Sequence, residues 1–210
     1  MTANTTDAGS ARILLFLKAP RPGEVKTRLA EAVGAERACA VYQTIAERPV
    51  RRWPGSMTPE IHYSPATAEP EMRAWLGDRV RLVPQTRGGL GERLEHAVAR
   101  AFADGAASVI CIGGDCPRLG ERHIREAIAL LDAGNDPVLG PCEDGGYYLI
   151  GLAAPHVELF SDIPWSAPDT LDATVERARA LGLHPAFLET LYDVDTVEDL
   201  ERATAEGIFP

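Results

Sequence analysis

The chain has 210 residues, of which 45% are hydrophobic and 25% charged, a composition typical of a folded globular protein. Acidic residues outnumber basic ones by 31 to 21, and the net charge of −10 argues against a general nucleic-acid binder, because an acidic surface repels phosphate. No apolar run approaches the roughly 20 residues that a membrane-spanning helix needs, so we expect no membrane partner.

The first residues, 1–10, are small and polar and do not resemble a signal peptide, so we expect a disordered tail and a cytoplasmic protein. Residues 11–210 contain no linker or repeat and are expected to form a single domain. Four cysteines lack metal-binding spacing and are predicted to be buried, reduced thiols. They are Cys39, Cys111, Cys116 and Cys142.

Apolar runs and helical periodicity predict strands that alternate with helices along the chain. Strands are predicted at 12–17, 60–63, 80–84, 108–112, 137–140 and 147–152, followed by a last extended segment at 186–191. Helices are predicted at 25–53, 69–76, 91–103, 121–131 and 171–181, and in a C-terminal segment. This order is typical of an α/β fold with a mainly parallel sheet that helices cover on both faces. Ligands of such sheets bind at the carboxyl ends of strands, so the segments after Leu17, Ile112 and Leu191 are the candidate functional ones.

The segment K-A-P-R-P-G-E-V-K-T-R-L, from Lys18 to Leu29, places four cations directly after the first strand. Helix-start N–H groups with Lys and Arg side chains are suited to a di- or triphosphate, although a solvated basic loop is the alternative. Neither the Gly-x-Gly-x-x-Gly pattern of dinucleotide sites nor the Walker ending is present. The candidate phosphate-binding residues are Lys18, Arg21, Gly23, Lys26, Thr27 and Arg28.

A second loop, Q-T-R-G-G-L-G, contains glycines that allow close approach to a flat base or simply form a long turn. This loop and Gly114, which follows the strand at 108–112, provide further candidates for nucleotide binding. The additional candidates are Gln85, Gly89, Gly91 and Gly114.

Three carboxylates are candidate metal ligands. Asp115 follows a buried strand in G-G-D-C-P and suits Mg²⁺ or Mn²⁺ shared with phosphate oxygens, although a hydrogen bond to its own turn is the alternative. Asp193 and Asp195 share one face if their segment is extended. Asp195, with Glu198 three residues later, is also predicted to cap the last helix. We expect Asp115 and Asp195 to hold one cation, with Asp193 as an auxiliary ligand.

The run P-C-E-D-G-G-Y-Y-L-I-G-L, at 141–152, combines acidic residues, a glycine pair and two tyrosines. These residue types suit an acceptor pocket, and a tight turn with a tyrosine packed between strands is the alternative. The candidate acceptor residues are Asp144, Gly145, Gly146, Tyr147 and Trp165. Asp144 is also a candidate catalytic residue, together with Asp115 and Lys26.

The order of these motifs resembles that of a bacterial family of GT-A-fold, nucleotide-diphospho-sugar transferase-like proteins related to 2-phospho-lactate guanylyltransferase. The resemblance covers nearly everything from Arg12 to Ala203 and extends to G-G-L-G-E-R-L, I-G-G-D-C-P-R-L, D-G-G-Y-Y-L-I-G-L, I-P-W-S and D-V-D-T-V-E-D-L. Members are often labelled glycosyltransferases, and some are associated with arsenosugar synthesis.

The resemblance implies roles at matching positions. The segment 26–28 looks like the phosphate-binding signature of nucleotidylyltransferases, although the stretch 20–23 replaces the usual double-glycine loop. Asp115 matches the carboxylate that holds the metal, and Asp195, with Asp193 beside it, matches a second one. Gly89 stands where the family commonly has an Asp, which removes a carboxylate from that loop.

These observations predict a metal-dependent transferase that uses a nucleotide-activated donor, with Mg²⁺ or Mn²⁺ as cofactor. We expect a nucleotide-sugar glycosyltransferase acting on a small-molecule acceptor, which the family labels and the altered glycine loop favour. The alternative is a nucleotidylyltransferase that joins a nucleoside triphosphate to a phosphorylated small molecule and releases pyrophosphate. The cation-rich first loop favours that alternative, because a triphosphate has more charge to neutralise. A non-catalytic nucleotide-binding regulator is the third hypothesis.

Overall fold

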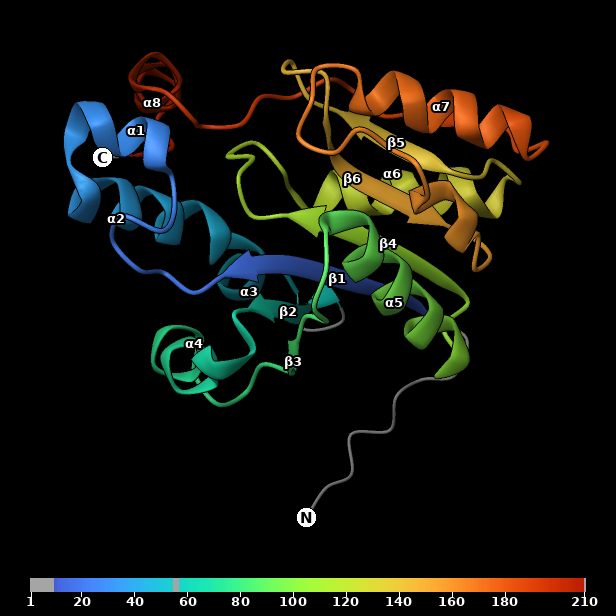
Figure 1. Ribbon diagram of the computed structural model, residues 1–210, viewed down its shortest axis with the longest axis horizontal. Helices are drawn as coiled ribbons and strands as arrows, with labels where there is room; N and C mark the ends of the chain where they lie inside the picture. The colour runs from blue at the N-terminus through green and yellow to red at the C-terminus, as the bar shows by residue number, and fades with distance from the viewer. Residues whose placement is uncertain (1–9, 55–56, 210) are drawn as a thin grey trace.

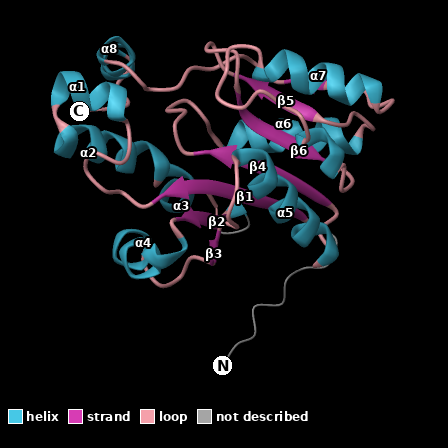
Figure 2. Cartoon of the chain, viewed as in Figure 1, coloured by secondary structure: helices cyan, strands magenta, loops and turns pink. Residues whose placement is uncertain are grey.

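Seven strands form one sheet in the computed structural model, which describes residues 10–54 and 57–209 (Figure 2). The sheet order is β3-β2-β1-β4-β6-β5-β7, and β6 alone runs antiparallel to its two neighbours. This arrangement confirms the predicted α/β fold with a mainly parallel sheet. The strands are β1 (Ala11–Lys18), β2 (Glu60–Ser64), β3 (Leu82–Pro84), β4 (Ser108–Gly113), β5 (Val138–Pro141), β6 (Tyr147–Leu152) and β7 (Ala186–Phe187).

The central strand β1 is buried on both faces, as its continuous apolar run predicts. Leu14 and Leu15, which point to opposite faces, are both completely buried. At its carboxyl end β1 pairs Lys18 with Ser64 of β2 and Phe16 with Gly113 of β4. This register brings the loops after β1, β2 and β4 to one edge of the sheet.

The predicted helical region at 25–53 is divided into three helices. Gly34, with a φ of +86°, separates the first two, and Glu47 separates the second from the third. Within the described residues, no helix combines the length and apolar character needed to cross a membrane. The helices are α1 (Thr27–Val33), α2 (Ala35–Ala46), α3 (Arg48–Arg52), α4 (Glu69–Leu76), α5 (Leu90–Ala103), α6 (Glu121–Asp132), α7 (Thr170–Ala180) and α8 (Val197–Ala205). Short 3-10 helices in the described part of the chain include η2 (Ala66–Ala68) and η3 (Val157–Phe160).

Helices cover both faces of the sheet (Figure 1). One face packs against α2, α4 and α6 through residues such as Ala46, Met72 and Ile124. The other packs against α5 and α7 through residues such as Val98 and Ala178. All four cysteines are buried and unpaired, which confirms the expectation of reduced thiols.

A third apolar cluster joins α1, α2 and α8 beyond the edge of the sheet. Leu29 of α1, Val41 of α2 and Leu200 of α8 are buried in it. In Figure 1, α8 lies beside α1, and a long segment leads to it across the molecule. The segment between β7 and α8 therefore crosses the carboxyl edge of the sheet, and this segment contains Asp193 and Asp195.

Candidate functional site

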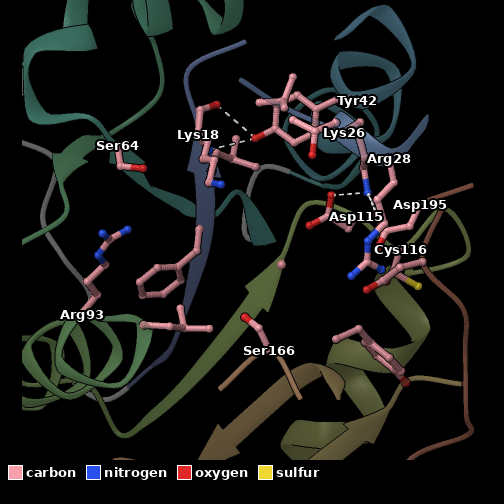
Figure 3. Close-up of a pocket in the computed structure, with 18 of the residues that line it drawn as sticks. Lys18, Lys26, Arg28, Tyr42, Ser64, Arg93, Asp115, Cys116, Ser166 and Asp195 are labelled. Atoms are coloured by element: carbon pink, nitrogen blue, oxygen red, sulfur yellow. Dashed lines mark hydrogen bonds and ion pairs between the residues drawn. The ribbon is translucent and has the colours of Figure 1, made fainter. Parts of the chain in front are cut away.

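A cavity of about 470 Å³ opens at the edge of the sheet where β1, β2 and β4 end (Figure 3). Its volume lies in the range of small-molecule sites. Parallel strands bring their following loops to the same edge, which is why residues distant in sequence meet here. The predicted site residues that line it are Lys18, Lys26, Thr27, Arg28, Gln85, Asp115, Tyr147, Asp193 and Asp195.

Lys26 connects two of the predicted metal ligands. It precedes α1 with a left-handed backbone, at a φ of 48°, and its side chain is only 3% exposed. Its Nζ lies 2.5 Å from Oδ1 of Asp115 and 2.9 Å from Oδ1 of Asp195. Burial lowers the pKa of Lys26, but the charges of the two carboxylates outweigh burial and raise that pKa overall. The ammonium therefore stays charged and holds the two carboxylates together.

Asp193 adds a third carboxylate to this cluster. Burial, followed by the charge of Asp115, raises the pKa of Asp193 to about 7. Across residues 10–54 and 57–209, no group of three His, Cys, Asp or Glu side chains has the arrangement of a metal centre. A cation bound here would therefore need further ligand atoms, and substrate phosphates supply these for Mg²⁺.

The predicted capping role of Asp195 is wrong. The N-cap of α8 is Thr196, whose Oγ1 accepts a hydrogen bond from the N–H of Asp199 at 3.3 Å. The Asp199 carboxylate in turn accepts from the N–H of Thr196 at 2.9 Å. This capping box begins one residue later than the predicted pair of Asp195 and Glu198. Both Asp and Thr are favourable N-cap residues, so residue type alone does not decide between Asp195 and Thr196. The shift leaves the Asp195 carboxylate to contact Lys26.

Tyr42 fixes the end of β1. Its hydroxyl accepts a hydrogen bond from the N–H of Lys18 at 2.9 Å and donates one to the Lys18 carbonyl at 3.0 Å. Sequence reasoning missed Tyr42, because it lies on the buried face of α2 with Cys39 and Ala46 and no motif contains it. Its hydroxyl nevertheless lines the cavity beside the phosphate loop (Figure 3).

Two candidates of the phosphate loop lie outside the cavity lining. The guanidinium of Arg21 donates from Nε and Nη2 to the two oxygens of Glu71 at 2.8 and 2.7 Å, a bidentate pair. Gly23 has a φ of +83° and provides the turn of the loop. The cations of this loop that line the cavity are therefore Lys18, Lys26 and Arg28.

Gly114 packs beneath the site. A Cβ on it would lie 2.5 Å from Cδ2 of Leu17 and 3.1 Å from Cβ of Ala46, so a side chain there would force these neighbours to shift. Its neighbour Gly113 lines the cavity instead, and nothing lies within 4 Å of a Cβ built on it.

The glycines at the start of α5 are also outside the lining. Gly89 is the N-cap, and its N–H donates to Oε2 of Glu92 at 2.7 Å. A Cβ on Gly91 would lie 2.6 Å from Nε1 of Trp165 and 2.7 Å from the carbonyl oxygen of Phe160. Both glycines therefore shape the end of the helix and its packing.

Among the predicted acceptor residues, Tyr147 lines the cavity. Trp165 contacts it edge to face, with 6.2 Å between ring centroids. Asp144 accepts from the N–H of Gly146 at 2.9 Å, and Gly145 has a φ of +87° with no room for a side chain. The turn thus supports the wall that Tyr147 forms.

Several further lining residues are not among the residues predicted for the site, although most of them lie within the motifs quoted above. Hydrophobic periodicity assigns most of them to strands and helices, and only the three-residue spacing of Leu90 and Arg93 at a helix start indicates a shared face. They are Phe16, Tyr42, Ser64, Leu90, Arg93, Cys116, Tyr148 and Ser166.

Comparison of structures shows the fold in other proteins. A candidate nucleotide-diphospho-sugar transferase from Desulfovibrio desulfuricans G20 is 35% identical, with a TM-score of 0.81 over 91% of this chain and 85% of that chain. CMP:2-keto-3-deoxy-manno-octonic acid synthetase, in complex with CTP, is 15% identical, with a TM-score of 0.57 and coverages of 95% and 98%. Rv0371c from Mycobacterium tuberculosis H37Rv, in complex with manganese, is 17% identical, with a TM-score of 0.50 and coverages of 92% and 97%. The last two show the fold alone.

No curated protein matches the sequence significantly. A family profile described as "Uncharacterized protein conserved in bacteria (DUF2064)" matches residues 53–167, more than half of the chain. The 35% identity to the Desulfovibrio protein confirms the resemblance to nucleotide-diphospho-sugar transferase-like proteins that the motifs indicate. The chain is a member of the DUF2064 family.

Proposed function

We propose that this protein transfers a sugar from a nucleoside diphosphate donor to a small-molecule acceptor with the help of a divalent cation. Its relationship to the Desulfovibrio protein makes it an enzyme of the transferase class that uses a nucleotide donor. The observation that carries the proposal is the placement of Lys26 between Asp115 and Asp195 in a cavity that other cations also line. Carboxylates and cations side by side suit a diphosphate bound through a metal.

The carboxylate pair fits Mg²⁺ or Mn²⁺. Asp115 and Asp195 direct hard oxygen atoms at one point, which the Lys26 ammonium now occupies, and their side chains are 47% and 42% exposed. Asp193 stands beside them as an auxiliary ligand. When bound, the cation would supply positive charge to the departing nucleoside diphosphate.

The protein's own cations hold the donor in this proposal. Lys18 and Arg28 line the cavity, and within the described residues neither forms an ion pair with a carboxylate. Both are therefore available to the diphosphate, while Lys26 is shared with Asp115 and Asp195. Tyr147 forms the wall that faces the acceptor, and Asp144 supports that wall as a candidate for catalysis.

The charge available in the cavity favours glycosyl transfer over nucleotidylyl transfer. The argument for a triphosphate depends on four cations in the first loop, but Arg21 pairs with Glu71 outside the cavity. Lys26 is already neutralised by two carboxylates. Of the first-loop cations in the described structure, Lys18 and Arg28 line the cavity without an ion pair, and two cations match a diphosphate more closely than a triphosphate. Nucleotidylyl transfer remains the second candidate, because Lys18, Lys26 and Arg28 together still line the cavity.

Calorimetric titration and thermal unfolding with Mg²⁺ or Mn²⁺ test the proposal. Nucleoside diphosphate sugars should bind more tightly than triphosphates, and a ligand at 100 times its Kd should stabilise the protein by about 2.7 kcal/mol. Arg28→Ala should weaken binding, whereas Arg21→Ala, a change in the same loop outside the cavity, should not. Tighter binding of triphosphates, with pyrophosphate as a product, would establish the nucleotidylyl alternative instead.

A further inference from the structure

Gln85 and Arg93 form a polar pair at the end of the cavity away from the carboxylates. The Gln85 side-chain amide donates to the His62 carbonyl at 2.7 Å and to the Leu17 carbonyl at 3.3 Å. Its Oε1 accepts from Nη1 of Arg93 at 3.2 Å. Both ends of the Gln85 amide are thus occupied within the protein, so this side chain holds Arg93 in place.

Arg93 has donor groups without a partner among the described residues at this end. Its Nε donates to the Gly88 carbonyl at 2.9 Å, which together with Gln85 fixes the plane of the guanidinium. Among the residues that the structure describes, no carboxylate forms an ion pair with Arg93. Its Nη2 group and the second N–H of Nη1 remain available to a ligand, and a guanidinium donates hydrogen bonds but never accepts them.

The surroundings of Arg93 suit a flat ring. Leu90 lies on the same face of α5, one turn earlier, and is 41% exposed although it lines the cavity. Phe16 of β1 also lines the cavity. In Figure 3, Arg93 and Ser64 lie on one side of the end of β1, whereas Arg28, Asp115 and Asp195 lie on the other. A nucleotide whose phosphates meet the carboxylates and cations would place its base on the side of Arg93.

We infer that Arg93 reads the nucleobase of the donor and selects a base with two adjacent hydrogen-bond acceptors, which guanine and cytosine have. This inference rests on the proposed function, because it needs the phosphates at the carboxylate end. Guanine presents O6 beside N7, and cytosine presents O2 beside N3, so a donor-only fork fits either edge. Adenine and uracil place an N–H next to each acceptor on the edges that such a fork could bind. That N–H would meet another donor.

Binding of GDP, CDP, UDP and ADP with Mg²⁺, measured by calorimetry, tests the inference. At least one of GDP and CDP should bind about 10- to 100-fold more tightly than UDP and ADP. In Arg93→Met the preferred nucleotide should weaken to the level of the others, while UDP and ADP bind as before. Arg87→Met, which changes an exposed arginine of the same loop outside the cavity lining, should retain the preference.

Arg93→Lys separates base reading from folding and from charge. It keeps the positive charge but lacks the planar fork, so it should lose the preference at an unchanged melting temperature. Equal binding of all four nucleotides by the unaltered protein, or an unchanged preference in Arg93→Met, would overturn the inference and leave the proposed function intact. If none of the four binds, the proposed function fails first and the inference fails with it.

Discussion

Nζ of Lys26 lies 2.5 Å from Oδ1 of Asp115, in the position that we propose for a divalent cation. Lys26→Met should therefore lower the unfolding free energy of the metal-free protein by about 1–2 kcal/mol, because Asp115 and Asp195 would then repel each other. The expected loss is smaller than for a fully buried ion pair, because water screens the half-exposed carboxylates. Mg²⁺ should restore part of this loss and bind more tightly than to the unaltered protein. Denaturant unfolding with and without Mg²⁺ measures both effects.

Arg28→Met is the matched control, because Arg28 lines the same cavity without an ion pair in the described structure. Its metal-free stability should equal that of the unaltered protein. A Lys26→Met variant with unchanged stability and unchanged metal affinity would show that the ammonium does not hold the carboxylates together.

The capping box at Thr196 predicts that stability and metal binding can be separated at adjacent residues. Thr196→Ala should lower the unfolding free energy by about 1 kcal/mol and leave Mg²⁺-dependent nucleotide binding intact. Asp195→Asn should do the reverse and abolish the coupling between Mg²⁺ and nucleotide with little loss of stability. Calorimetry and denaturant unfolding of both variants provide the comparison. Intact coupling in Asp195→Asn would transfer the ligand role to Asp193.

Tyr42→Phe should affect both folding and donor binding. It removes two hydrogen bonds to the backbone of Lys18, so the unfolding free energy should fall by about 1 kcal/mol. Donor affinity should fall as well, since the loop after β1 loses its fixed starting point. Tyr192→Phe is a useful control, because Tyr192 lies outside the cavity lining and its hydroxyl donates to Oε2 of Glu206 at 2.8 Å. A Tyr42→Phe variant with unaltered donor affinity would limit Tyr42 to a structural role.

A buried ion cluster at the start of β2 should control acid stability. Burial raises the pKa of Glu60, but the hydrogen bond from His62 and the charges of Arg100 and Arg81 outweigh burial and hold that pKa below its usual 4.5. Burial lowers the pKa of His62 below its usual 6.5. Both groups therefore stabilise the folded state above their ordinary pKa values, and this stability is lost as pH falls through the folded ones.

Glu60→Gln tests that dependence. At pH 7 the variant should be less stable by about 3 kcal/mol, because the two arginines lose a buried partner. The difference from the unaltered protein should shrink as the pH falls below 4.5, which unfolding curves at several pH values would measure. Nucleotide affinity at pH 7 should not change. A difference that stays constant down to low pH would mean that Glu60 does not titrate in this range.

The sequence predicts those parts of the site that follow directly from strand order. Asp115 and the phosphate loop come immediately after buried strands, so the parallel sheet places them at one edge. Asp195 is placed by the packing of α8 on α1 and α2, a contact between distant segments that local periodicity does not contain. The cap was predicted one residue early because Asp195 and Thr196 are both good N-caps.

Side-chain pairing explains the other differences. Arg21 has the charge and position of a phosphate ligand, but Glu71, 50 residues away, pairs with it outside the cavity. Arg93 lies on a helix whose apolar face indicates only packing, and the role that we propose for it depends on Gln85, which lies before that helix in the loop after β3. Such pairs become visible only when the tertiary contacts are known.

The absence of a side chain at Gly91 has a consequence for how the cavity responds to its ligands. Helix α5 rests directly on Trp165 and on the backbone at Phe160, and a single added carbon would not fit between them. Arg93 follows Gly91 on that helix, and Ser166, next to Trp165, lines the same cavity. The two walls are therefore in direct contact, and we expect a ligand that displaces one wall to move the other. Donor and acceptor should therefore change each other's affinity by the same factor. The contact of Gly91 with Trp165 and with the backbone of Phe160 would transmit this effect.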